Sequence, residues 1–173
     1  SLYSPDGEGG FPGNIRVITD YRFNEDNELS VRHYAETDCA TYINMTNHAY
    51  FNLCGKGKKI TEHRLHIPAD RILDTTPAFI PTGKRMNVKN TPFDFTSLKP
   101  IGTDLYADHE QLLWNKGYNH CYILKDEISV EMLEAASLYE PVTGRNMTVM
   151  TDLPAVLLYT AGYYERPDTA VCL

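Results

Sequence analysis

The chain has 173 residues, which is enough for one domain with a substantial core. With 16 basic and 23 acidic residues its formal net charge is −7, and this argues against nucleic acid or an anionic membrane surface as the partner. No apolar stretch approaches the roughly 20 residues of a membrane-spanning helix. Four scattered cysteines without a CxxC pair favour reduced thiols, a cytoplasmic protein and no structural zinc.

Period-two alternation of apolar residues dominates the first third of the chain. It predicts strands over 15–23 and 29–35, joined by a polar hairpin loop at 24–27. Further strands are predicted over six segments: 40–46, 64–68, 120–125, 128–138, 146–151 and 155–160. Twelve tyrosines, many β-branched residues and frequent turn signals are typical of an all-β antiparallel sandwich.

Helix and turn signals are few. One short helix is predicted within 104–114, with Asp104 as its N-cap. Hairpin turns are predicted at 55–58, 81–84 and 141–145, the last with Gly144 at a positive φ. We see no linker, and a single domain over 1–173 is expected.

The run NMTNHAYFN at 44–52 places His48 among uncharged hydrogen-bonding residues and aromatic rings. Imidazole exchanges a proton near neutral pH, so this setting suits proton transfer to a sugar oxygen. A histidine satisfied within a core or turn is the plainer interpretation. Asn47, Tyr50 and Asn52 would hold the ring or line a pocket, and an ordinary structural role is equally consistent with them.

Four other segments occur in the same order as in one known family: SPDGEGGFPGN at 4–14, AD at 69–70 with PTG at 81–83, TPFDF at 91–95, and GYNHCYIL at 117–124. Together with 44–52 they resemble the aldose 1-epimerases, the galactose mutarotases. The resemblance implies a galactose mutarotase-like supersandwich, His48 as the catalytic acid, and Asn119 as a sugar-binding residue. It implies a monosaccharide substrate such as galactose or glucose, and neither metal nor another cofactor.

The same resemblance reveals departures and gaps. The family usually has aspartate at Asn119 and glutamine at Leu157, so the pocket is expected to bind the family sugar differently. In the family, sugar-holding residues precede the SPDG loop and a glutamate base follows the Cys172-Leu173 pair. We therefore expect a partial domain that lacks N-terminal and C-terminal portions and is inactive as it stands.

Two function hypotheses follow. The first is an aldose 1-epimerase that interconverts α and β anomers by acid/base ring opening, and the second is a catalytically impaired mutarotase-like carbohydrate-binding protein. A glycoside hydrolase using Asp94, Asp104, Asp108 or Glu110 ranks third, because these carboxylates lie in polar turn and helix segments. His63 and His66 are expected on opposite faces of a strand, which disfavours a shared metal.

Overall fold

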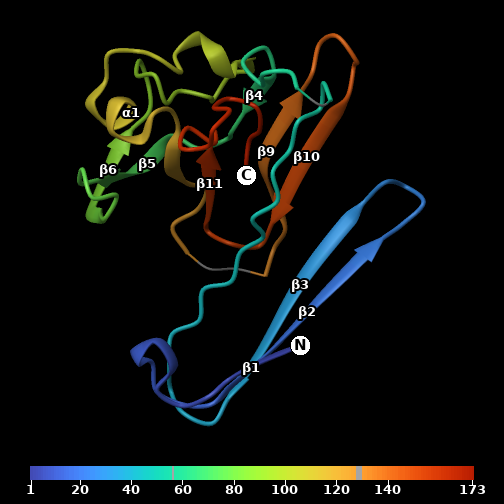
Figure 1. Cartoon of the computed structure of the whole chain (residues 1–173), viewed down its shortest axis with the longest axis vertical. Helices are drawn as coiled ribbons and strands as arrows, with labels where there is room; N and C mark the ends of the chain where they lie inside the picture. Colours follow the sequence, from blue (N-terminus) through green and yellow to red (C-terminus); the bar gives the residue numbers. More distant parts are fainter. Residues whose placement is uncertain (56, 128–129) are drawn as a thin grey trace. The chain divides into compact units, whose positions relative to one another are not determined.

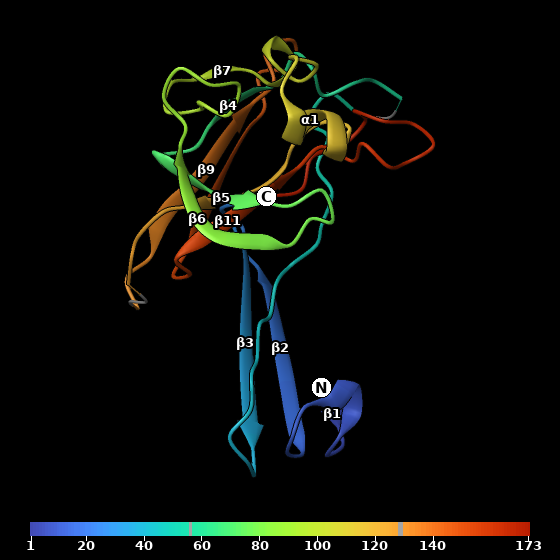
Figure 2. The same ribbon diagram turned by 90° about the vertical axis from the view of Figure 1, so that its left-hand side faces the viewer.

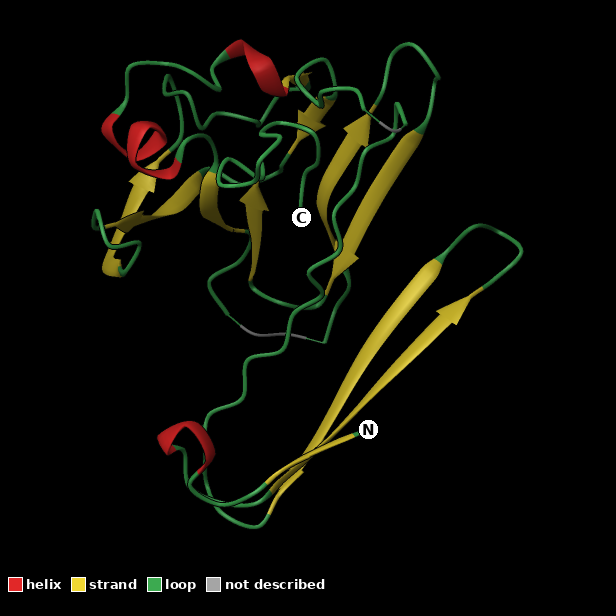
Figure 3. Ribbon diagram, in the orientation of Figure 1, coloured by secondary structure: helices red, strands yellow, loops and turns green. Residues whose placement is uncertain are grey.

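The computed structural model describes residues 1–55, 57–127 and 130–173. The chain forms two compact units, Ser1–Asn47 and His48–Leu173. Strands predominate in both, with only short helical pieces, and the predicted all-β antiparallel class is confirmed (Figure 3). In the described part of the chain, no helix is long and apolar enough to cross a membrane.

The first unit is a three-stranded antiparallel sheet in the order β1-β2-β3 (Figure 1). Its strands are β1 (Leu2–Ser4), β2 (Ile15–Phe23) and β3 (Leu29–Thr37), with a 3₁₀ turn at Glu8–Gly10. The β2–β3 hairpin confirms the prediction from alternation. At its tip the Asn24 side-chain oxygen accepts hydrogen bonds from the backbone N–H groups of Asp26 and Glu28, and this fixes the turn.

The second unit contains two four-stranded antiparallel sheets. The first has the order β10-β9-β4-β7 and is built from β4 (Arg64–His66), β7 (Lys99–Pro100), β9 (Leu133–Tyr139) and β10 (Asn146–Thr151). The second has the order β11-β8-β5-β6 and is built from β5 (Arg71–Thr75), β6 (Pro81–Asn87), β8 (Asn119–Ile123) and β11 (Ala155–Tyr159). Figure 2 shows α1 (Glu110–Asn115) above β5 and β6 of this second sheet, and the Gln111 side chain of α1 donates to the Asp74 carboxylate of β5 at 2.7 Å.

Side chains from both sheets form one hydrophobic core. Its largest fully buried members are aromatic and aliphatic residues: Tyr118, Tyr122, Phe93, Phe95, Leu65, Ile72, Leu138 and Leu158. In β8 the alternation buries His120 and Tyr122 and leaves Asn119 and Cys121 only half-buried on the other face. The Tyr122 hydroxyl donates to the Phe93 backbone carbonyl at 3.0 Å, so the buried phenol is satisfied.

Three predictions were wrong: one strand, one turn and the start of the helix. Residues 40–46 form no strand. A strand needs a hydrogen-bonded neighbour, and the local sequence pattern does not show whether one is present. Residues 81–84 begin β6, since Pro81 lies opposite Thr75 and the turn falls at 76–80 instead. The helix begins at Glu110, where the His109 side chain accepts from the Gln111 N–H, while Asp104 instead binds Lys99 Nζ at 2.7 Å.

The other predicted strands are confirmed, 146–151 with its predicted bounds as β10 and the rest with shifted ends. The strand predicted over 128–138 corresponds to β9 (Leu133–Tyr139), and positions 128–129 lie outside the described residues. The turn predicted at 55–58 includes position 56, which is also outside them. The turn at 141–145 is confirmed: Gly144 has φ 73°, and Asn146 lies opposite Tyr139.

Candidate active site

One hollow in the second unit has a volume of about 370 Å³. Six side chains line it: His48, Phe79, Asn119, Leu157, Tyr159 and Tyr163. The size suits a small organic ligand, whose pockets usually measure roughly 300–1,000 Å³. His48 and Asn119, which the sequence singled out separately, therefore face the same space.

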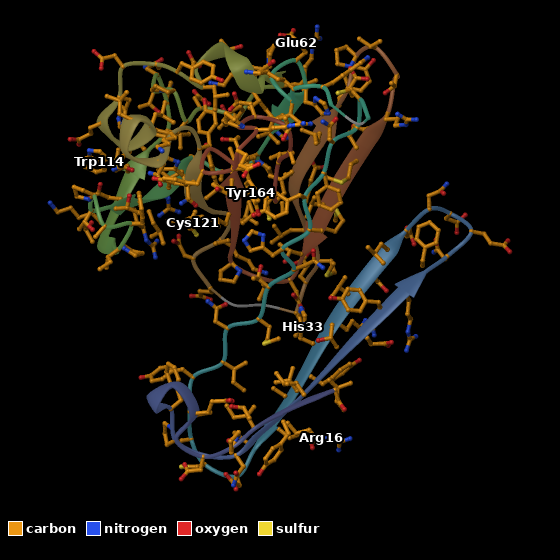
Figure 4. The ribbon with its side chains drawn as sticks, viewed as in Figure 1. Arg16, His33, Glu62, Trp114, Cys121 and Tyr164 are labelled. Atoms are coloured by element: carbon orange, nitrogen blue, oxygen red, sulfur yellow. The ribbon has the colours of Figure 1, made fainter. Side chains whose placement is uncertain are left out.

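The floor of the hollow is built from β8 and β11. Asn119 lies opposite Tyr159 in this antiparallel pair, and Cys121 lies opposite Leu157. Residues that face each other in a ladder, and those two apart along a strand, share one side of the sheet. The outward face of the β8–β11 pair thus presents an amide, a phenol and a leucine side by side; Cys121 of this face is labelled in Figure 4.

His48 enters the hollow from the segment that precedes Phe51. Its side chain is exposed, and its ring centroid lies 5.0 Å from that of Tyr50. The segment is held in place where Phe51 forms a two-hydrogen-bond bridge with Val171, at 2.8 and 3.0 Å. The Nδ1 atom of His48 lies 3.6 Å from Cys172 Sγ. The imidazole is thus open to a ligand on one side and supported by the protein on the other.

Aromatic rings form the wall of the hollow. Phe79 meets Tyr163 edge-on, with ring centroids 6.0 Å apart and an interplanar angle of 70°. Lys116 Nζ lies 5.1 Å from the Tyr163 ring centroid, and the Tyr163 hydroxyl donates to the Trp114 backbone carbonyl. These contacts hold the Tyr163 ring, so the wall presents an apolar aromatic face to the hollow.

The electrostatic character of the hollow is close to neutral. Among the six described lining residues none carries a carboxylate or an ammonium group, and His48 supplies an imidazole. Nearby, the pKa of Tyr50 is raised mainly by a hydrogen bond with Tyr164 and to a smaller extent by burial. Its phenol therefore stays protonated at neutral pH. Tyr164 is labelled in Figure 4. The arrangement suits uncharged, hydroxylated ligands.

Other residues that the sequence singled out have structural roles. The Asn52 side-chain nitrogen donates to the backbone carbonyls of Lys58 and Thr169 at 2.8 and 2.9 Å. His63 is buried and its Nε2 accepts from the Leu53 N–H, whereas His66 pairs with Glu134 at 3.3 Å. Within residues 1–55, 57–127 and 130–173, no three His, Cys, Asp or Glu side chains gather as metal ligands.

Sequence reasoning missed four residues of this region: Phe79, Tyr159, Tyr163 and Cys172. Phe79 lies in the 76–80 turn and Tyr163 in the loop after β11, where no periodic pattern marks a wall residue. Tyr159 was seen only as part of an apolar strand. Cys172 was considered only as part of the Cys172-Leu173 pair. Its contact with His48, which lies 124 positions earlier, could not be predicted from the local sequence.

A family model described as aldose 1-epimerase matches residues 1–173. The chain is 35% identical over 163 residues to the aldose 1-epimerase of Escherichia coli strain K12, covering 94% of this chain and 46% of that protein. It is also 35% identical over 166 residues to the galactose mutarotase of Homo sapiens, covering 95% of this chain and 46% of that protein. The chain thus spans about half the length of the curated relatives it matches.

Solved structures agree with these sequence relatives. The crystal structure of galactose 1-epimerase from Lactobacillus acidophilus NCFM superposes with a TM-score of 0.87 at 28% identity, covering 99% of this chain and 51% of that one. A GalM/aldose epimerase homologue from C. elegans has a TM-score of 0.83 at 24% identity, which bears on the fold alone. Since the family model matches from residue 1 to residue 173 and the relatives are 35% identical, this chain belongs to the aldose 1-epimerase family.

Proposed function

We propose that the native protein carrying this chain interconverts the α and β anomers of a hexose such as galactose or glucose. The observation that carries the proposal is that His48 and Asn119 line one neutral, aromatic-walled hollow. The relatives described above, an aldose 1-epimerase and a galactose mutarotase, support the same reaction. The single domain expected over 1–173 stays a prediction.

In this proposal His48 exchanges a proton with the ring oxygen of the sugar. Ring opening needs a proton delivered to that oxygen while a base removes one from the anomeric hydroxyl, and ring closure reverses both transfers. Asn119 binds sugar hydroxyls through its amide, which offers both a donor and an acceptor. No carboxylate that could serve as the base is among the described residues that line the hollow.

The wall of the hollow supports a monosaccharide substrate. The exposed Phe79 and Tyr163 rings present apolar surface, while His48 and Asn119 present polar groups to the same hollow. A pyranose has the matching pair of surfaces, with C–H groups on its faces and hydroxyls around its edge. We also propose a cytoplasmic location, supported by four cysteines that are all free thiols.

Polarimetry on freshly dissolved α-D-galactose tests the proposal. The native protein should accelerate the approach to the equilibrium rotation, and His48→Ala should lower the rate by roughly 10²–10⁴. His66→Ala is the matched control, since His66 lies on β4 and outside the hollow, and it should keep full activity. An unchanged rate in His48→Ala would refute the assignment.

A second candidate function is sugar binding without catalysis. Asn119 and the 45% exposed Leu157 favour it, because they place an uncharged amide and an aliphatic chain in the binding face. A native protein that binds galactose in calorimetry but leaves the optical rotation to decay at the uncatalysed rate would select this alternative.

A further inference from the structure

Residues 171–172 form a clasp between two parts of the candidate site. On one side Val171 exchanges two backbone hydrogen bonds with Phe51. On the other, the Cys172 N–H donates to the Tyr159 carbonyl at 2.8 Å and the Tyr159 N–H donates back at 3.0 Å. The clasp therefore joins the His48 segment to β11, with Val171 bonded to Phe51 and Cys172 bonded to Tyr159.

The clasp brings the Cys172 thiol against the imidazole. Sγ lies 3.6 Å from His48 Nδ1, which is within hydrogen-bond range for sulfur. Cys172 is only 5% exposed, whereas His48 is exposed. Burial raises the pKa of the Cys172 thiol, so the sulfur beside the ring is uncharged at neutral pH.

The position of the sulfur decides which ring nitrogen is available to a ligand. The two nitrogens of an imidazole point away from each other across the ring, and the hydrogen bond made by one sets the role of the other. Because Nδ1 faces Cys172, Nε2 is the nitrogen that is directed away from the protein contact. The ring lines the hollow, so we expect Nε2 to be the nitrogen that a bound ligand meets.

We propose that Cys172 is a positioning residue: its sulfur accepts a hydrogen bond from Nδ1–H of His48 and so reserves Nε2 for proton exchange with the substrate. This inference rests on the proposed function. When the ring opens, the imidazolium passes its Nε2 proton to the sugar ring oxygen. The neutral ring that remains carries its hydrogen on Nδ1, and on closure Nε2 takes a proton back from the same oxygen.

An uncharged sulfur suits a histidine that must release its proton. A carboxylate at Nδ1 would stabilise the imidazolium strongly, as it does where histidine serves as a general base. A thiol is a weak acceptor, so it orients the ring without holding the cation. The pairing thus favours rapid exchange in both directions, which an anomer interconversion requires.

Nitrogen-15 NMR of the native protein without sugar provides the first test. At a pH where His48 is neutral, its shifts should show hydrogen on Nδ1 and a bare Nε2. Cys172→Val removes the acceptor at similar size and should move the ring toward the Nε2–H tautomer, whereas Cys172→Ser should retain the Nδ1–H form. Hydrogen on Nε2 in the unmodified protein, or an unchanged tautomer in Cys172→Val, would overturn the proposal.

Kinetics provide the second test. Losing one weak hydrogen bond corresponds to about a three- to tenfold change, so Cys172→Val should lower kcat by that factor with KM unchanged, and Cys172→Ser should recover most of it. Cys54→Val, at a thiol bonded to Asn52 instead, should leave both constants unchanged. A rise in KM alone would contradict a positioning role. If the native protein proves inactive, the tautomer measurement still decides this inference while the proposed function fails.

Discussion

Asn119 of β8 lies directly opposite Tyr159 of β11, and both side chains line the hollow that contains His48. The pairing places an amide beside a phenol on the exposed face of a sheet whose other face is core. Substitutions on the exposed face should therefore change binding, and substitutions one position along should change stability.

Asn119→Asp should tighten galactose binding by the native protein about five- to tenfold. A carboxylate accepts charge-assisted hydrogen bonds from sugar hydroxyls, and these are about twice as strong as neutral ones. Isothermal titration calorimetry measures the dissociation constant. Asn146→Asp on β10, which adds the same charge outside the hollow, is the control; equal or weaker binding by Asn119→Asp would mean that the pocket suits another ligand.

Leu157→Gln should strengthen sugar binding with little effect on folding. The Leu157 side chain is 45% exposed in the hollow, so a polar group there stays hydrated until a sugar hydroxyl replaces the water. The free energy of unfolding should therefore change by less than about 0.5 kcal/mol. Leu158→Gln, one position along and fully buried, should instead cost about 2–5 kcal/mol. Urea unfolding measures both, and similar losses in the two variants would contradict the observed register.

Phe79→Asn should separate backbone strain from ligand contact. Phe79 has φ 63°, a left-handed conformation that costs an ordinary residue roughly 1–2 kcal/mol and that asparagine tolerates. The variant should unfold with a free energy up to about 1 kcal/mol higher, yet bind sugar several times more weakly because the ring that faces Tyr163 is lost. Ala78→Asn, the neighbouring exposed position, should gain no stability; a gain of equal size there would refute the role of strain at Phe79.

Acid should destabilise the second unit partly through His120. Burial, with a smaller contribution from His109, lowers the pKa of His120 to about 3 from its ordinary value of 6.5. The unfolded chain therefore binds a proton that the native state excludes, so this contribution to stability is complete above pH 6.5 and is lost as the pH falls toward 3.

Urea unfolding at pH 7, 5 and 4 checks this expectation. His120→Gln lacks the titrating ring, so its free energy of unfolding should fall less steeply with decreasing pH than that of the unsubstituted protein. His33→Gln, on β3 of the first unit, is the matched control and should keep the original slope. Parallel pH profiles for the His120→Gln variant and the unsubstituted protein would contradict the assignment.

Local patterns predicted much of the fold. The β2–β3 hairpin joins neighbouring strands with a polar tip, so alternation and the 24–27 cluster suffice to specify it. The same reasoning failed at 40–46, where an alternating pattern has no strand beside it, and at 81–84, where proline and glycine occur within β6 rather than in the turn. A strand depends on a neighbour that the local sequence does not specify.

Only the residues of the candidate site that lie in family motifs could be predicted from the sequence. His48 and Asn119 stood out because each lies in a recognisable motif, and the structure places both on one hollow. Phe79 and Tyr163 meet there because of loop paths after β5 and β11, and Cys172 meets His48 through the clasp. Contacts of this kind arise from tertiary packing, which a single sequence records only indirectly.

The clasp also determines when the hollow can exist during synthesis. His48 leaves the ribosome early, but its Nδ1 partner lies 124 positions later. β8 and β11 pair with each other without residues 171–172, whereas the bridge between Phe51 and Val171 and the contact of Cys172 with His48 form only once those residues are present. A ligand that needs the oriented His48 ring therefore stabilises the finished unit by mass action rather than its earlier folding intermediates.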